Sequence, residues 1–456
     1  MAASNVQMDY IWGDDDETQT FAHAHDGKGA GLIFRILRDG RRPKSLASRI
    51  VACFHELPVA SSSETFQDRS EMRKVLDESI RLAWPDCAHA SKVPSTIVDL
   101  VCEDEDRMDW RMQDEPELYQ QYLSSLLEAN HVSVSHPTER GCEFVDQGDL
   151  IMIERLPGRG ASAVVMRRSS DGEDKSRYVF KGPGFGDFLA SRKDFAHIRD
   201  MFYHSVKTIT SIPPHPNILP PAPILVVARF PADESHQLVC GSLYPFMSRG
   251  TLDDHVTRSK ENNDCLKLRD KARWCLQLCS AVAHTHHAAH TYHMDIKPAN
   301  VLVDDEGNAV LIDWEQSGAP TYTLAPEANG EWDVEEVEIP GALPRLAYTR
   351  YEGPRRVNMT FGRPAWNVFP EWSERWPRAC AAAEVFSVGR TMWMLLQEVT
   401  QKDIEDLAAD KIIVSWDEDT DIPECWREVV MKCMEKDPNE RIKLTELVAF
   451  WEEQQI

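Results

Sequence analysis

Three apolar patterns divide the chain into segments with different expected structures. Apolar residues recur at helical spacing in residues 194–212 and 268–287, which predicts two long amphipathic helices. Residues 392–396 are apolar on all sides, as is typical of a buried helix. Short runs rich in β-branched and aromatic residues indicate strands at 150–156, 178–181 and 238–243. The chain from about residue 148 onward therefore mixes strands and helices.

The first part of the chain, residues 1–147, has a weaker pattern and no recognisable chemistry. Helical apolar spacing occurs at 47–57, 71–83 and 117–129, and residues 32–37 are compatible with a strand. Acidic runs between these segments are typical of solvated surface. We expect an N-terminal extension, partly helical or disordered, whose residues 1–140 can be removed without unfolding the rest. A partner-docking module is the alternative.

Composition limits the classes of partner and compartment. The 456 residues carry a net charge of −25, which disfavours duplex nucleic acid and anionic membranes as partners. The 11 cysteines are scattered without a Cys-x-x-Cys pair, which favours a reducing compartment. The start of the chain has no basic and apolar leader, and the longest apolar stretch, 218–230, is interrupted by prolines. We expect an intracellular protein, cytoplasmic or nuclear.

The main chemical signal is the run 293–303, HMDIKPANVLV, followed by Asp313. A carboxylate (Asp295), a cation (Lys297) and an amide (Asn300) share one polar loop between a predicted helix and a short apolar run. Phosphoryl transfer from a nucleotide needs this set of groups. One carboxylate orients the attacking hydroxyl, an amide and a second carboxylate hold Mg²⁺, and a cation neutralises the moving group.

This arrangement resembles the catalytic and metal-binding loops of eukaryotic protein kinases, His-Arg-Asp-x-x-x-x-Asn and Asp-Phe-Gly. Lys297 is typical of the Ser/Thr branch. Other segments resemble the family's motifs in the same order along the chain. They are the glycine-containing loop 158–165, the lysine-ending strand 178–181, the hinge 245–247, the segment 318–327 (GAPTYTLAPE), EVFSVG at 384–389 and DPNER at 437–441.

The resemblance implies a two-lobed α+β protein kinase fold with an N-terminal extension. A small β-rich N-lobe with one regulatory helix would span 148–245, and a larger, mainly helical C-lobe would span 246–452. An insert at about 328–378 departs from the family and contains Phe369-Pro370-Glu371, a rival for the Ala-Pro-Glu role of 325–327. With 325–327 in that role, Glu327 and Arg441 would form a buried structural pair.

The resemblance also implies a site. Asp295 would orient the hydroxyl and Lys297 would stabilise charge on the transferred group, while Asn300 and Asp313 would hold Mg²⁺. The expected nucleotide contacts are Gly158, Gly160, Val165, Lys181, Tyr244, Phe246, Met247, Asn300 and Asp313. The implied function is ATP-dependent transfer to Ser or Thr hydroxyls of protein substrates, with ATP and Mg²⁺ as cofactors.

Departures from the family leave two alternatives open. Ser205 stands where a glutamate should pair with Lys181, and Trp314-Glu315 replaces Phe-Gly. These changes suggest a pseudokinase that acts as a nucleotide-binding or scaffold protein. A small-molecule kinase shares the loop motif, but Lys297 and the late Arg441 motif favour a protein substrate. Partners could dock through the extension or the insert.

Two further expectations concern the helix end and the loop after Asp313. Histidines 284, 286, 287 and 290 lack the spacing of a closed zinc set, so packing and solvation are their default roles. Met294 stands where regulated kinases have an arginine that a loop phosphate neutralises. The resemblance therefore implies activity that does not wait for phosphorylation of Ser317, Thr321, Tyr322 or Thr323.

Overall fold

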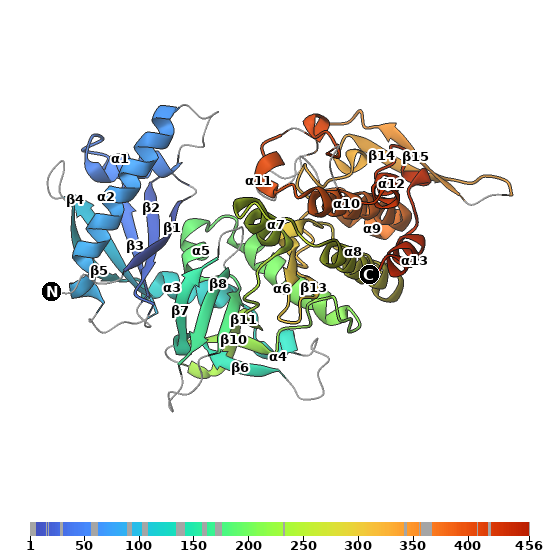
Figure 1. Cartoon of the computed structure of the whole chain (residues 1–456). Coiled ribbons are helices and arrows are strands. Elements are labelled where there is room, and N and C mark those ends of the chain that lie inside the picture. The colour runs from blue at the N-terminus through green and yellow to red at the C-terminus, as the bar shows by residue number, and fades with distance from the viewer. Residues whose placement is uncertain are drawn as a thin grey trace. The chain divides into compact units, whose positions relative to one another are not determined.

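The computed structural model describes residues 6–14, 16, 18–27, 31–55, 63–88, 94–102, 108–133, 142–156, 162–168, 176–230, 233–341, 344–354, 356, 367–407, 409–417 and 421–455. The chain divides into two compact units. The first joins Met1–His204 to Ala222–Phe246, and the second joins Ser205–Pro221 to Met247–Ile456. Both units contain strands and helices, so the chain has the α+β class that its sequence predicts (Figure 1).

The first unit begins with a mixed five-stranded sheet. Its strands are β1 (Gln7–Gly13), β2 (Gln19–His25), β3 (Gly31–Leu37), β4 (Thr96–Cys102) and β5 (Met108–Asp114), hydrogen-bonded in that order. All neighbours are antiparallel except β3 and β4, which are parallel. A parallel pair needs a long crossover, and helices α1 (Leu46–His55) and α2 (Ser63–Cys87) lie in that connection.

Alternation along β3 explains why the helices cover one face of this sheet. Leu32, Phe34 and Ile36 are buried and form a cluster with apolar residues of α1 and α2. The sequence predicted β3 and the two helices, but it gave no signal for the other four strands. All four contain charged or polar residues among short apolar runs, and such runs become strands only when a neighbouring strand pairs with them.

The opposite face of the sheet joins the core of the rest of the first unit. Trp12, Phe21 and Ile97 belong to one buried cluster with Tyr122 and Phe188, which come from later helices. Phe21 is fully buried. Removing residues 1–140 would take these aromatic side chains out of a shared core, so we now expect that truncation to destabilise the rest of the first unit.

The second sheet of the first unit has six strands in the order β6-β10-β11-β9-β8-β7. They are β6 (Glu143–Asp146), β7 (Leu150–Arg155), β8 (Ser162–Arg167), β9 (Arg177–Lys181), β10 (Ile224–Phe230) and β11 (Asp233–Pro245). The helices beside it in sequence are α3 (Pro116–Ser125), α4 (Ala129–Ser133), α5 (Phe185–Ala190) and α6 (Phe195–Ser211). β6 pairs in parallel with β10, so this sheet begins a few residues before the boundary expected at 148.

The second unit is mainly helical. Its helices are α7 (Leu252–Glu261), α8 (Leu268–His284), α9 (Phe369–Arg375), α10 (Pro377–Gln397), α11 (Gln401–Ile404), α12 (Glu424–Cys433) and α13 (Leu444–Glu453). Two antiparallel hairpins accompany them, β12 (Val301–Val303) with β13 (Ala309–Leu311), and β14 (Trp332–Val337) with β15 (Arg345–Arg350).

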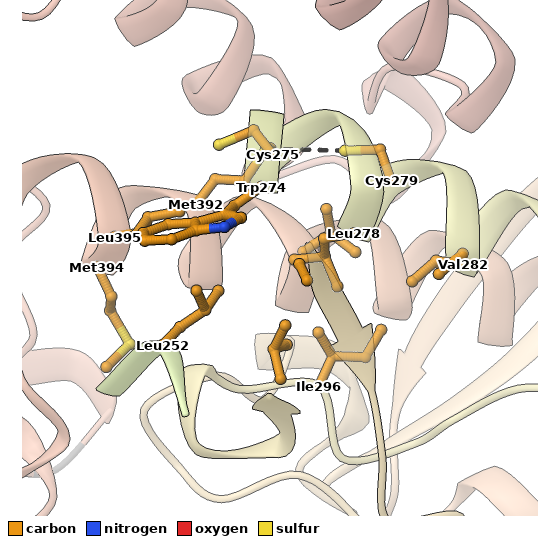
Figure 2. Close-up of a cluster of buried hydrophobic side chains, with 14 of the residues drawn as sticks. Leu252, Trp274, Cys275, Leu278, Cys279, Val282, Ile296, Met392, Met394 and Leu395 are labelled. Carbon is orange, nitrogen blue, oxygen red and sulfur yellow. Dashed lines mark hydrogen bonds between the residues drawn. The ribbon is translucent and has the colours of Figure 1, made fainter. Parts of the chain in front are cut away.

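The core of the second unit lies between α8 and α10. Figure 2 shows Leu278 and Val282 of α8 facing Met392 of α10 and Ile296 of the polar loop. The Sγ of Cys279 contacts the Sδ of Met392 at 3.8 Å, the dashed line in that view. α10 is buried over almost its whole length, and the burial of residues 392–396 confirms the prediction from their all-apolar pattern. The polar loop packs on this core through Ile296.

Candidate functional site

The polar loop is anchored at both ends by backbone contacts. The ring of His293 bonds the carbonyl of Ile312 at 2.7 Å through Nε2, and its Nδ1 accepts from the amide of Asp295 at 3.2 Å. Met294 adopts a left-handed φ of 66°, an uncommon conformation outside glycine. His293 therefore ties the start of the loop to the residue that precedes Asp313.

In the polar loop, a buried apolar residue lies between two residues with functional polar side chains. Ile296 is fully buried in the core of the second unit (Figure 2), whereas its neighbours Asp295 and Lys297 pair with each other at 2.6 Å. A short 3₁₀ turn, Pro298–Asn300, then leads into β12. The Asn300 carbonyl accepts from the amide of Ile312 at 2.9 Å, which holds the two loops together.

The two carboxylate oxygens of Asp295 have different surroundings. Oδ2 accepts from Lys297 Nζ at 2.6 Å and from Asn300 Nδ2 at 3.1 Å. Oδ1 is buried and has no hydrogen-bond partner among the described residues. Buried carboxylate oxygens are normally paired, so an unpaired one in a polar loop marks the place where another molecule's donor belongs.

Burial raises the pKa of Asp295 above the usual range of an aspartate. The adjacent Lys297 opposes that shift by charge and hydrogen bonding, and the negative charge of Asp313 adds to it. Asp295, Lys297, Asn300 and Asp313 thus form one electrostatic group, as the sequence predicts.

Asp313 lies two residues after the end of β13 and has a left-handed φ of 71°. The next residue, Trp314, is buried, and its ring lies 4.7 Å from that of His293, centroid to centroid. The tryptophan therefore fills the space under the loop.

The sequence singled out Glu384 only as the first residue of EVFSVG, and its role as a buried carboxylate that positions the loop was not predicted. Glu384 of α10 accepts from the amide of Met294 at 2.6 Å through Oε1, and its Oε2 bonds His286 Nε2 at 2.5 Å. Both side chains are almost fully buried. The available signal was the place of this glutamate at the start of the EVFSVG motif. Of the four clustered histidines, His286 therefore has this partner, and His284 bonds the Pro213 carbonyl at 2.9 Å.

A π-helical turn brings His286 to Glu384. Thr285–Ala289 has π geometry at the end of α8, and His290 then adopts a left-handed φ of 48°. Single-turn π bulges are rare and often lie beside functional sites. Here the wide turn ends α8 immediately before the polar loop.

The other expected site residues belong mainly to the first unit. Lys181 ends β9 and is half-buried, and Val165 is buried in β8. Tyr244 lies in β11, and Arg177 stacks over the ring of Phe246. Met247 begins the second unit's main segment. Gly158 and Gly160 lie outside the described residues.

The buried pair predicted between Glu327 and Arg441 is confirmed. Arg441 donates from both terminal nitrogens to the two oxygens of Glu327, at 2.5 and 2.9 Å. A two-pronged guanidinium–carboxylate pair of this kind is strong and specific. The rival Glu371 instead forms an exposed pair with Arg375 at 2.9 Å. The structure therefore assigns the structural role to 325–327.

The segment between Asp313 and Glu327 is tied down by neutral contacts. Gln316 donates through Nε2 to the Tyr292 carbonyl at 2.5 Å, and Asn367 donates to the Gln316 carbonyl at 3.2 Å. Tyr322 and Thr323 are buried, whereas Thr321 is exposed. Met294 packs in the apolar cluster under this segment.

The insert contributes the hairpin β14–β15, which docks on the DPNER motif. Asn439 donates to the Leu346 carbonyl at 3.0 Å and accepts from the Leu346 amide at 2.8 Å, so it covers the outer edge of β15. Val334 and Leu346 pack in a cluster with Trp372 of α9. The insert is therefore part of the fold of the second unit.

Comparison with known proteins gives a partial match. The protein kinase domain model matches residues 224–325, a segment that includes the polar loop and Asp313. Among curated proteins, an L-type lectin-domain containing receptor kinase V.5 of Arabidopsis thaliana is 30% identical over 194 residues, 42% of this chain and 23% of that protein.

Two other relatives are named as Ser/Thr kinases. The probable serine/threonine-protein kinase FMP48 of Saccharomyces cerevisiae is 31% identical over 118 residues, 25% of this chain and 29% of that protein. Serine/threonine-protein kinase 16 of Homo sapiens is 34% identical over 99 residues, 22% of this chain and 30% of that protein. The chain thus spans 23–30% of the length of these relatives. Within the described residues, no helix is long and apolar enough to cross a membrane.

Proposed function

We propose that this chain transfers the γ-phosphoryl group of ATP to Ser or Thr hydroxyls of protein substrates, because residues 224–325 match the protein kinase domain model and resemble Ser/Thr kinases. In this proposal residues 148–245 form the N-lobe, 246–452 form the C-lobe with its insert at about 328–378, and 1–147 precede them. The substrate is a protein rather than a small molecule because Lys297 and Arg441 both keep the pattern of protein kinases.

The observation that carries the proposal is the asymmetry of Asp295. One oxygen is held by Lys297 and Asn300, and the other is buried without a described partner. In the reaction, Asp295 Oδ1 accepts a hydrogen bond from the substrate hydroxyl. This contact orients the hydroxyl oxygen toward the phosphorus of the γ-phosphoryl group. Lys297 Nζ lies 2.6 Å from Asp295 Oδ2. In this proposal its positive charge balances the negative charge on the oxygens of the transferred group.

The donor set also fits Mg²⁺. The amide nitrogen of Asn300 is used by Asp295, so its oxygen is the atom left for a ligand. The carboxylate of Asp313 supplies the second oxygen, and oxygen atoms are the ligands that Mg²⁺ prefers. When bound, Mg²⁺ neutralises charge on the nucleotide phosphates. Lys181 and Val165 are the first-unit residues that we assign to the nucleotide.

The second candidate is a pseudokinase. Ser205 lies in α6 where the family has a glutamate for Lys181, and loss of that ion pair would weaken phosphate positioning. The four groups of the polar loops are nevertheless present, and catalysis of this kind rests mainly on them. We therefore favour an active enzyme.

Transfer of labelled phosphate from ATP to a generic basic protein tests the proposal. Mg²⁺-dependent incorporation into Ser or Thr is the expected result. If the full chain binds nucleotide but labels no substrate under any metal condition, the pseudokinase interpretation replaces the proposal.

Replacing Lys297 by Met should move the acidic limb of the pH profile to higher pH. Asp295 must be ionised to accept the hydroxyl proton, and burial already raises its pKa. Lys297 lowers the pKa of Asp295, so removing Lys297 raises that pKa further. As the pH falls, Asp295 of the variant therefore becomes protonated, and activity is lost, at a higher pH than in the wild type. The measurement is kcat/KM against pH, with the exposed Lys432→Met variant of α12 as control. A limb that stays in place in Lys297→Met contradicts the proposed contact.

Phosphatase treatment should leave the activity unchanged. The segment after Asp313 is held by Gln316 and Asn367 through neutral contacts, and Met294 offers no charge for a phosphate. Protein from a bacterial host, where it is not phosphorylated by other kinases, should match phosphatase-treated protein from its own cell in kcat. Collapse of activity on treatment, with a stoichiometric phosphate at Ser317 or Thr321, would show that a hidden basic partner exists.

A further inference from the structure

Arg390 of α10 is a buried cation without a counter-charge. The residue is 8% exposed, and two of its guanidinium nitrogens, Nε and Nη1, are covered and have no hydrogen-bond partner among the described residues. No described carboxylate lies within ion-pair distance of it. A buried charge that lacks a partner is costly, so such a residue calls for an explanation.

Two aromatic rings hold the guanidinium in place. Its central carbon lies 5.5 Å from the ring centroid of Phe386 and 5.6 Å from that of Trp393, both on the same face of α10. These contacts supply favourable electrostatics but accept none of its N–H groups. Burial lowers the pKa of Arg390 to about 10, so the group stays protonated at neutral pH and its donors stay unused.

The neighbours of Arg390 place it beside the segment that follows the polar loop. One turn earlier on α10, Ser387 donates to the Thr323 carbonyl at 2.8 Å. Phe386 belongs to the same apolar cluster as Leu324 and Ala325. On the other side, Trp393 donates to the Ser415 carbonyl at 3.0 Å. Nη2 of Arg390 is not among the covered, unpaired nitrogens, and the residue keeps 8% of its surface exposed.

We propose that Arg390 recognises a carboxylate or phosphate on the protein substrate, so that this chain selects acidic or already phosphorylated segments. This inference rests on the proposed function and names its substrate class. An anion that reaches Nη2 from solvent would satisfy a donor of a pre-positioned guanidinium, and charge-assisted bonds of this kind are strong. The chain's net charge of −25 repels anionic peptides at long range. The selection therefore comes from local contact and is measured at physiological salt, where that repulsion is screened.

A peptide series tests this proposal. Each peptide has one Ser acceptor and one variable flanking position that holds Ala, Glu or phosphoserine, and that position is scanned along the peptide. At one position we expect kcat/KM to exceed the Ala value by about 10- to 100-fold for an anionic residue. The Glu and phosphoserine arms tell the two sources of negative charge apart.

Arg390→Met is the matched variant, because it keeps the length and apolar contacts of the side chain without its charge. It should remove the preference and leave the rate on the Ala peptide unchanged. Arg375→Met, at an exposed arginine of α9, should keep the preference. Equal rates on anionic and neutral peptides, or a preference that survives in Arg390→Met, would overturn the inference.

Peptide binding without turnover separates this inference from the proposed function. Isothermal titration compares the Glu, phosphoserine and Ala peptides on the wild-type chain and on Arg390→Met. If no peptide is phosphorylated, the proposed function fails. The binding preference then still decides whether Arg390 is an anion receptor, and equal affinities reject it.

Discussion

Asp295→Asn should abolish phosphoryl transfer and leave ATP affinity nearly intact. The substitution keeps the shape of the side chain and an oxygen for Lys297, but it removes the negative charge that orients the hydroxyl. General-base and positioning groups contribute about 100- to 10,000-fold, so kcat should fall by at least about two orders of magnitude. The measurement is single-turnover transfer from labelled ATP, together with nucleotide binding by titration.

A matched control exists on the turn between β12 and β13. Asp305 is exposed and contacts Arg249 through its backbone carbonyl rather than its carboxylate. Asp305→Asn should therefore transfer at the wild-type rate. Equal transfer by the wild-type protein and Asp295→Asn would mean that the observed labelling comes from a contaminant, and the assignment of Asp295 would be withdrawn.

Phe21→Ala should destabilise the first unit by about 3–5 kcal/mol. Phe21 is fully buried, its ring stacks on Trp12 with centroids 5.8 Å apart, and both belong to the cluster that joins the two sheets of that unit. Truncation leaves a cavity in a core that contains residues from both sheets. Chemical denaturation followed by tryptophan fluorescence and by circular dichroism measures the loss.

The control for this variant is Leu82→Ala on α2, where the side chain is 65% exposed and truncation creates no cavity. The denaturant concentration at the midpoint of its unfolding should stay near that of the wild type. If Phe21→Ala also unfolds at the wild-type midpoint, the first sheet contributes little to the stability of the rest, and the extension is separable as its sequence suggested.

Several functional features were predictable because the signal was local. Asp295, Lys297 and Asn300 lie within one short loop, so their spacing alone places them on one support. Asp313 follows a short apolar run, and its relation to Asp295 follows from the pairing of β12 with β13. Glu327 and Arg441 are distant in sequence, and their pairing was predicted by resemblance to a family rather than by local pattern.

Other features depended on contacts between distant segments. The bond of His286 to Glu384 joins the end of α8 to α10, and no pattern around His286 distinguishes it from the neighbouring histidines. The same holds for Arg390, which in the sequence is one cation in a helix. Our proposal for it rests on two buried guanidinium nitrogens that have no hydrogen-bond partner among the described residues, and only the packed structure reveals which donors lack a partner.

The sequence by itself determined the α+β class, the polar loop and the residues on it, because helix periodicity and closely spaced side chains are properties of short segments. Tertiary structure decided the place of the first 114 residues in the core of the first unit, the anchor at Glu384 and the lack of a described partner for two nitrogens of Arg390. Strand pairing and the burial of charge depend on which distant segments meet, since a strand forms only beside a partner and a cation is costly only where water is excluded.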